Sequence, residues 1–204
     1  MSASAGGPTP TLIAIDGLDG SGKSQLAARL AEECAAAALP AMLVHVDDFR
    51  RPLSFDGLEA AAEADLYYGS YYDLAALDQR LRALLAGGAG GVVIVEGVFL
   101  LRVPVVAERA VLVALEIGAD EARRRIVARD REKGRSDQEI ARRIDRRYFP
   151  GNARYRAEHE VPARAALSID NDDWRRPRVT RRDAARLAAV APALAALLDA
   201  LFPI

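Results

Sequence analysis

Short apolar runs alternate along most of this chain with longer segments in which apolar residues recur every three or four positions. The short runs are rich in β-branched side chains, and most of them end at an acidic residue. This pattern is typical of the buried strands of a parallel sheet. We expect five strands, at residues 11–15, 41–46, 92–95, 110–117 and 165–169.

The longer segments predict helices between these strands. Leu74, Leu77 and Leu81 lie on one face at helical spacing, and Asp120 and Ser136 are expected to cap the starts of two further helices. We expect helices at residues 24–38, 58–68, 73–86, 120–132, 136–147 (resuming after Pro150-Gly151 to residue 160) and 181–201 (kinked at Pro192).

The alternation of strands and helices implies an α/β fold in three layers, with a five-stranded parallel sheet covered by helices on both faces. A chain of 204 residues suffices for one core and is short for two, so residues 11–204 are expected to form a single domain. The small and polar residues 1–10 predict a disordered leader. An arginine-rich segment at about 125–150 is expected to act as a mobile lid.

Composition narrows the class of protein. Half of the residues are apolar and the formal net charge is −1, so no large field attracts nucleic acid or an anionic membrane. Cys34 is the only cysteine, which rules out an intrachain disulfide, and neither a signal peptide nor an apolar run of membrane-spanning length is found. We therefore expect a cytoplasmic protein with no nucleic-acid or membrane partner.

Residues Gly17–Ser24 match the pattern G-x-x-x-x-G-K-[ST] between a predicted strand and a predicted helix. The glycines let the backbone turn tightly and present its N–H groups to phosphates, and the helix that follows points its positive end at the same anion. Lys23 is expected to reach the β- and γ-phosphates and Ser24 to ligate Mg²⁺. Lys23 and Lys133 are the only lysines among 28 basic residues, so a lysine at this place is not incidental.

The pattern predicts a P-loop NTPase fold and a nucleoside triphosphate ligand, ATP with Mg²⁺. The residues expected at the nucleotide are Gly17, Asp19, Gly20, Ser21, Gly22, Lys23, Ser24 and Gln25.

Acidic residues follow three of the predicted strands, at the edge of the sheet where ligands of open α/β sheets bind. Transfer of a phosphoryl group to an alcohol needs a carboxylate for the hydroxyl proton and another near the metal. Asp47 or Asp48 suits the first task and Glu96 the second. The alternative is that these acids only solvate loops or cap helices.

Arginines crowd the predicted lid, and Arg129 and Arg135 are the best candidates to hold phosphate there. Arg129 is also expected to serve catalysis, together with Lys23 and Asp47. The alternative is a solvated helix surface.

Four tyrosines precede Asp73, and Tyr72 with Asp73 could hold a ring-bearing, hydroxylated acceptor or simply pack and cap a helix. Phe49 could wall the same pocket, while His45 is interpreted as a packed core histidine.

These elements together resemble the uridine kinase/phosphoribulokinase branch of the P-loop kinases. The resemblance spans residues 11–171 and is carried by the phosphate loop and by 46–49, 72–78, 95–97, 129–135, 155 and 169–171. It implies that Asp47 accepts the proton of the acceptor, that the acidic residue at Asp73 holds a ribose, and that lid arginines hold the phosphates of ATP. Uridine kinases carry a base-reading hairpin where this chain has only 87–91, and the short connection also resembles nicotinamide riboside kinases.

The leading hypothesis is a kinase that phosphorylates a hydroxyl of a small metabolite such as a nucleoside. A non-nucleoside alcohol or a nucleoside monophosphate is the alternative acceptor, and Arg50, Arg51 and Arg80 are available for a monophosphate. A GTPase-type switch lacks its N-K-x-D and D-x-x-G motifs here, and a polynucleotide kinase would need a basic channel. The identity of the acceptor and the oligomeric state, a homodimer included, stay open.

Overall fold

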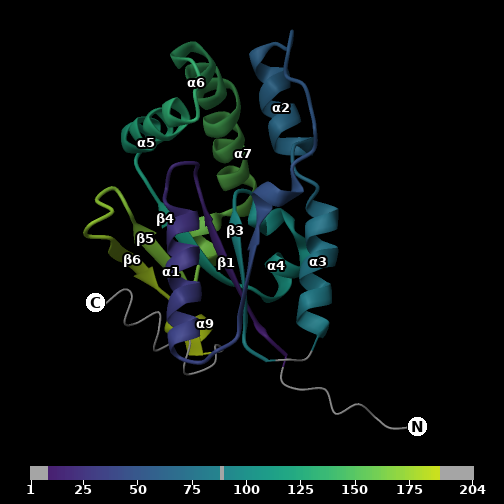
Figure 1. Ribbon diagram of the computed structural model, residues 1–204, viewed down its shortest axis with the longest axis vertical. Coiled ribbons are helices and arrows are strands. Elements are labelled where there is room, and N and C mark those ends of the chain that lie inside the picture. Colours follow the sequence, from purple (N-terminus) through teal and green to yellow (C-terminus); the bar gives the residue numbers. More distant parts are fainter. Residues whose placement is uncertain (1–8, 88–89, 189–204) are drawn as a thin grey trace.

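The computed structural model describes residues 9–87 and 90–188, and within them the chain forms a six-stranded sheet of order β2-β3-β1-β4-β5-β6 (Figure 1). The strands are β1 Thr11–Gly17, β2 Ala41–His45, β3 Val92–Gly97, β4 Val111–Glu116, β5 Leu167–Asp170 and β6 Arg178–Arg182. The first five strands pair in parallel, and β1 lies at the centre between β3 and β4. The α/β architecture is the predicted one.

Helices surround the sheet and extend above its carboxyl edge. They are α1 Lys23–Ala36, α2 Ala60–Ser70, α3 Leu74–Ala86, α4 Pro104–Arg109, α5 Ala119–Glu132, α6 Asp137–Arg143, α7 Phe149–His159, α8 Val161–Arg164 and α9 Ala184–Ala188. Short 3-10 helices occupy Val46–Phe49 and Leu100–Arg102, and Ile144–Tyr148 forms a π-helical turn between α6 and α7.

Alternate residues of β1 divide the core into two halves. Ile13 and Ile15 pack on one face with α1 and α9, whereas Leu12 and Ala14 pack on the other face with α3 and α4. Because both faces are covered, the central strands carry apolar residues at nearly every position. The three predicted layers are therefore present.

The sixth strand corrects the prediction of five. Arg178–Arg182 pairs antiparallel with β5, where the sequence pattern favoured a helix beginning at residue 181. Val179 packs against the core beside α1, and its neighbours in the strand are partly exposed or exposed, as at the edge of a sheet. The rest of the predicted closing helix beyond residue 188, with its kink at Pro192, lies outside the described residues, as do most of the predicted leader and part of the turn at 87–91.

The arginine-rich segment forms α5, α6, the π-helical turn and the start of α7, which stand with α2 above the sheet (Figure 1). Ser136 caps α6 as predicted, since its side chain accepts from the N–H of Glu139 at 3.2 Å. Gly118 and not Asp120 is the N-cap residue of α5. Pro150 lies in the first turn of α7, where a missing N–H costs nothing, so it does not interrupt the helix. No helix of the described residues is both long and apolar enough to cross a bilayer.

Candidate active site

The phosphate loop joins the end of β1 to the start of α1. Gly20 and Gly22 have φ angles of +82° and +95°, in the left-handed region that glycine adopts readily. A Cβ atom on Gly22 would lie 2.8 Å from the side-chain nitrogen of Asn171, which donates to the Ser21 carbonyl oxygen at 2.7 Å. The loop is thereby held in a turn that leads into the N-terminus of α1, whose first N–H groups lack helical partners and suit an anion.

Lys23 bends back over this loop. Its Nζ donates to the carbonyl oxygen of Leu18 at 2.9 Å, and the residue is only 8% exposed. A buried ammonium group with a loop carbonyl as its partner is ready to exchange that partner for a phosphate oxygen.

A buried carboxylate lies beneath the loop. Asp16 is fully buried, and its Oδ2 accepts hydrogen bonds from the Tyr155 hydroxyl and, at 3.1 Å, from the N–H of Leu100. The Tyr155 hydroxyl in turn accepts from the N–H of Leu101 at 2.8 Å. Burial raises the pKa of Asp16 to about 6, although the Tyr155 hydrogen bond and the charge of Lys23 both lower it. This network ties α7 to the base of the phosphate loop.

A hydroxyl and a carboxylate meet beside the loop. Ser24 Oγ donates to Glu96 Oε1 at 3.0 Å, and His45 Nδ1 lies 2.6 Å from the same oxygen. Magnesium prefers oxygen ligands and keeps several waters and substrate oxygens, so these two oxygens fit the expected ion. Within the described residues no group of three His, Cys, Asp or Glu side chains could hold a metal alone. The His45 side chain is 39% exposed, so its interpretation as a core histidine is wrong.

A cleft of about 560 Å³ brings the loop and the strand-end acids together. Of the predicted site residues it is lined by Asp19, Gly20, Gly22, Lys23, Ser24, Gln25, Asp47, Tyr72, Glu96 and Arg129. The cleft lies at the carboxyl ends of β1 and β3, just beyond β2, and is bounded on its other side by α5. This is the edge at which open α/β sheets bind ligands.

Asp47 follows β2 and is held by two partners. Tyr72 donates to its Oδ1 at 3.3 Å, and Arg50 forms an ion pair with its Oδ2. In the same way, Tyr67 donates to Asp19 Oδ2 at 3.3 Å. Burial and the nearby charge of Asp19 raise the pKa of both tyrosines well above the ordinary value, so both phenols stay protonated donors.

Arg129 enters the cleft from α5, and its Nε donates to the fully buried Asp130 at 2.8 Å. Arg135 pairs with the other oxygen of Asp130 at 3.2 Å and does not line the cleft. The buried carboxylate of Asp130 therefore binds both of the favoured lid arginines. Of these two, only Arg129 lines the cleft.

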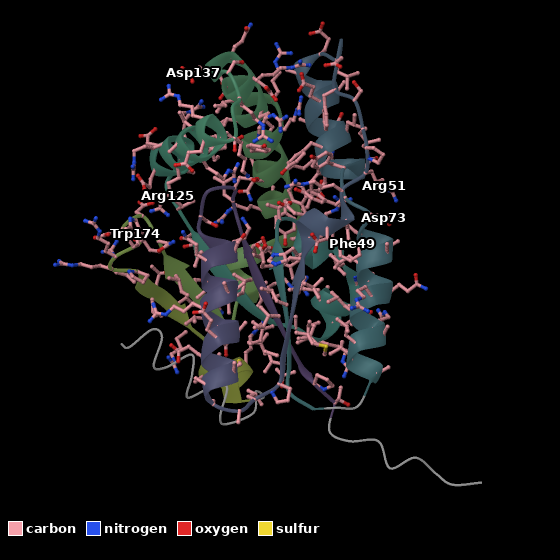
Figure 2. The ribbon with its side chains drawn as sticks, viewed as in Figure 1. Phe49, Arg51, Asp73, Arg125, Asp137 and Trp174 are labelled. Atoms are coloured by element: carbon pink, nitrogen blue, oxygen red, sulfur yellow. The ribbon has the colours of Figure 1, made fainter. Side chains whose placement is uncertain are left out.

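The remaining predicted site residues lie outside the lining of the cleft: Gly17, Ser21, Asp48, Phe49, Asp73 and Arg135. Asp73 caps α3 by accepting from the N–H of Ala76 at 3.0 Å, and its other oxygen pairs with Arg51 at 3.0 Å (Figure 2). Phe49 packs against the core, and Asp48 is exposed. Gly17 and Ser21 belong to the loop itself.

Four further residues line the cleft. Arg124 and Arg125 belong to the arginine-rich segment predicted as the lid, whereas Glu132, also on α5, and Trp174, 60% exposed in the segment after β5, were not predicted as site residues. Arg125 donates to the backbone carbonyls of Asn171 and Asp172 at 2.7 Å each, on the same side of the molecule as Trp174 (Figure 2). The crowding of arginines in this segment was the signal for Arg124 and Arg125, and no pattern in the sequence marked Glu132 or Trp174.

Comparison with known proteins places the fold. No family model and no curated protein matches the chain. A proposed fructose transport system kinase from Silicibacter sp. TM1040 is 26% identical, with a TM-score of 0.55 over 76% of this chain and 88% of the other. A proposed uridine kinase from Bacillus stearothermophilus is 20% identical, with a TM-score of 0.57 over 79% of this chain and 89% of the other. The chain thus has the fold of the P-loop kinases, and the resemblance found in the sequence is confirmed at that level.

Proposed function

We propose that this P-loop kinase fold carries an ATP-dependent phosphotransferase that acts on a hydroxyl group of a small metabolite. One observation carries the proposal: a single cleft joins the phosphate loop to the carboxylate of Asp47. A nucleotide-binding module without turnover would need no carboxylate opposite its phosphate loop.

The donor half of the site binds phosphates. The N–H groups of the loop and the start of α1 are suited to cradle them, and Lys23 exchanges its bond to Leu18 for a phosphate oxygen. Ser24 and Glu96 would hold Mg²⁺ through oxygen atoms. When bound there, the ion would neutralise charge on the phosphate oxygens.

Asp47 positions the acceptor and takes its proton. The acceptor oxygen bonds to the γ-phosphorus while the bond to the β,γ-bridging oxygen breaks, ADP leaves, and the hydroxyl proton passes to the carboxylate. Tyr72 holds one oxygen of Asp47 through its hydrogen bond. The exposed Arg50, which pairs with the other oxygen, must release that oxygen to the acceptor hydroxyl or share it.

Arginines on α5 close the donor side. Arg124, Arg125 and Arg129 line the cleft from one helix, and a guanidinium group there stabilises charge on the transferring phosphoryl group. Closing α5 over the nucleotide would exclude water, which otherwise hydrolyses ATP.

The acceptor is a nucleoside or, as the alternative, a non-nucleoside alcohol or a nucleoside monophosphate. The name of the Silicibacter structure supports a sugar, and that of the Bacillus structure a nucleoside. We further propose a cytoplasmic enzyme that acts without nucleic acid or membrane.

An ADP-release assay with Mg²⁺-ATP tests this function against a panel of nucleosides, sugars and vitamin precursors. Turnover with one acceptor should fall by about 10²- to 10⁴-fold in Asp47→Asn. Asp48→Asn is the matched control, because its carboxylate is exposed and outside the cleft, and it should keep near-normal turnover. Equal losses in both variants, or full activity in Asp47→Asn, would refute the assigned role.

A further inference from the structure

Trp174 is a large aromatic side chain that the fold leaves in the open. It is 60% exposed and belongs to no core cluster of the described residues. Even so, it lines the same cleft as Lys23 and Ser24. The Arg175 guanidinium lies over the ring, 5.2 Å from its centre, and the exposed area leaves ring surface for a second flat group. An indole that contributes so little to the core is available to a ligand in the cleft.

Two hydrogen bonds hold the loop that carries Trp174. This loop, residues 171–177, joins β5 to β6. The Asn171 amide donates to the carbonyl oxygen of Ser21 in the phosphate loop at 2.7 Å. Asp172 Oδ1 accepts from the N–H of Gly118, the N-cap residue of α5, at 2.6 Å. The loop therefore has a fixed place relative to both the phosphate loop and the helix that bounds the donor side.

Trp174 and Asp47 lie at opposite ends of the cleft. The order of the sheet is β2-β3-β1-β4-β5-β6, so Asp47 follows the strand at one edge and Trp174 lies between the two strands at the other edge. The phosphate loop follows β1, between them. Figure 2 shows this separation, with Trp174 on the side of Arg125 and away from Phe49 and Asp73. A ligand that reaches from Asp47 to Trp174 must cross the phosphate loop.

The geometry of phosphoryl transfer sets the direction of the donor. The attacking and leaving oxygens lie roughly in line, on opposite sides of the transferred phosphorus. With the acceptor oxygen beside Asp47, the β-phosphate must lie on the side of the γ-phosphate that faces away from Asp47. The rest of the nucleotide then leads across the phosphate loop toward α5 and the β5–β6 loop. Of the residues that line the cleft, Trp174 is the aromatic one at that end.

We propose that Trp174 stacks on the base of the donor nucleotide, so that the donor must carry an aromatic base and a purine is preferred to a pyrimidine. Every base can stack on an aromatic side chain, and a two-ring purine covers more of an indole than a one-ring pyrimidine does. This assignment rests on the proposed kinase function for its donor site, and it does not depend on the identity of the acceptor.

Intrinsic fluorescence tests the stacking directly, because Trp174 is the single tryptophan of the chain. Mg²⁺-AMPPNP should change the indole emission, since its base replaces water on the ring. Mg²⁺-tripolyphosphate fills the phosphate loop but has no base, so it should raise the melting temperature and leave the emission almost unchanged. An equal change in emission with both ligands, or no change with bound AMPPNP, would overturn the inference.

Substitution separates the base from the phosphates. Trp174→Ala should weaken the binding of AMPPNP by about 5- to 100-fold and leave the binding of tripolyphosphate as in the wild type, both measured by calorimetry. Trp174→Phe should recover most of the lost affinity, because it restores an aromatic face. Arg176→Ala is the matched control, since Arg176 is exposed on the same loop and lies outside the lining of the cleft, and it should bind both ligands normally.

The preference for a purine is measured with ATP and CTP in the absence of an acceptor. The wild type should bind ATP more tightly by about fivefold or more, and the difference should shrink in Trp174→Ala. A preference for ATP that survives in Trp174→Ala would show that another group reads the base, and would overturn the inference.

The two ligands also separate this inference from the proposed function. If the wild type binds neither AMPPNP nor tripolyphosphate, the proposed kinase function itself fails. If both ligands bind and Trp174→Ala weakens neither of them, or weakens both equally, only the assignment of Trp174 fails.

Discussion

Lys23 shows at the scale of one residue how the loop is prepared for a ligand. Its ammonium group is buried yet keeps a carbonyl partner, so binding a phosphate replaces one good interaction by a stronger, charge-assisted one. The residue therefore contributes to ligand binding more than to the fold.

We expect Lys23→Ala to lower turnover by about 10²- to 10³-fold, because the transferring phosphoryl group loses a charged donor. The ADP-release assay and calorimetric binding of AMPPNP measure the loss. Lys133→Ala is the matched control, since Lys133 is exposed at the end of α5, and it should behave like the wild type. A normal affinity for AMPPNP in Lys23→Ala would contradict the assigned role.

Asp16 links single-residue chemistry to stability. Burial raises the pKa of Asp16 from the ordinary value of 3.8, expected in the unfolded chain, to about 6 in the folded protein. The folded protein therefore binds this proton more tightly than the unfolded chain does. The stability that this contributes is complete below pH 3.8 and is lost as pH rises through about 6.

Asp16→Asn should not lose stability as the pH rises through 6, because the amide of asparagine carries no charge at any pH. We expect the free energy of unfolding of Asp16→Asn, relative to the wild type, to rise by about 2 kcal/mol between pH 4 and pH 7. Urea unfolding of the ligand-free protein across this range measures it. Asp48→Asn, at an exposed carboxylate, should show no such trend, and a flat difference for Asp16→Asn would disprove the assignment.

At the scale of elements, α2 is clamped to the arginine-rich segment. Glu63 of α2 is fully buried and accepts from Arg142 at 2.7 Å, Arg147 at 2.9 Å and Arg146 at 3.4 Å. The Arg147 guanidinium also lies 3.7 Å from the ring centre of Phe55. These ion pairs join α2 to α6 and the π-helical turn.

Glu63→Gln should destabilise the protein by about 3 kcal/mol, because three partly exposed arginines lose the buried carboxylate that they share. Burial alone would raise the pKa of Glu63, but hydrogen bonds from Arg147 and Arg142 outweigh it and hold the pKa below its ordinary value. The stability from this group is therefore present above pH 4.5 and is lost as pH falls through the lower folded pKa.

Thermal unfolding at pH 7 and at pH 3 tests the clamp. The difference in melting temperature between Glu63→Gln and the wild type should be smaller at pH 3 than at pH 7. Glu59→Gln, at the exposed residue that precedes α2, serves as the control and should change stability little at either pH. A loss for Glu63→Gln that is equal at both pH values would show that packing, and not charge, is responsible.

The cleft is a property of the whole molecule, since its lining runs from Asp19 to Trp174. A ligand that binds only this assembled site stabilises the fold by mass action. Mg²⁺-AMPPNP at about 100 times its dissociation constant should add about 2.7 kcal/mol and raise the melting temperature by about 5–10 °C.

Removing the metal should reduce that rise. We expect EDTA to reduce the AMPPNP-induced rise in melting temperature of the wild type. Glu96→Gln should show a similarly reduced rise even with Mg²⁺ present, because one of the two oxygen ligands of the metal has lost its charge. Each shift is taken relative to the same protein without nucleotide. A shift that is independent of Mg²⁺ would argue against a metal at Ser24 and Glu96.

Much of the fold follows from local patterns. The central strands can be predicted because they are buried on both faces and are therefore apolar at nearly every position. The phosphate loop Gly17–Ser24 can be predicted because all of its functional residues lie in one contiguous stretch. The edge strand β6 was missed because an exposed edge strand carries little apolar signal: Val179 is its only apolar residue, and pairing with β5 supplies the rest.

The sequence by itself therefore determined the α/β alternation and the phosphate loop, because short-range periodicity and backbone geometry encode them. Only the tertiary structure decided which of the two favoured lid arginines lines the cleft: Arg129 and Arg135 share Asp130, and of the two only Arg129 is among the lining residues. It alone joined Asp16 to Tyr155, residues 139 positions apart, and it paired Arg50 with Asp47 and Arg51 with Asp73. Such pairings depend on which side chains folding brings within hydrogen-bond reach, and no local pattern records that distance.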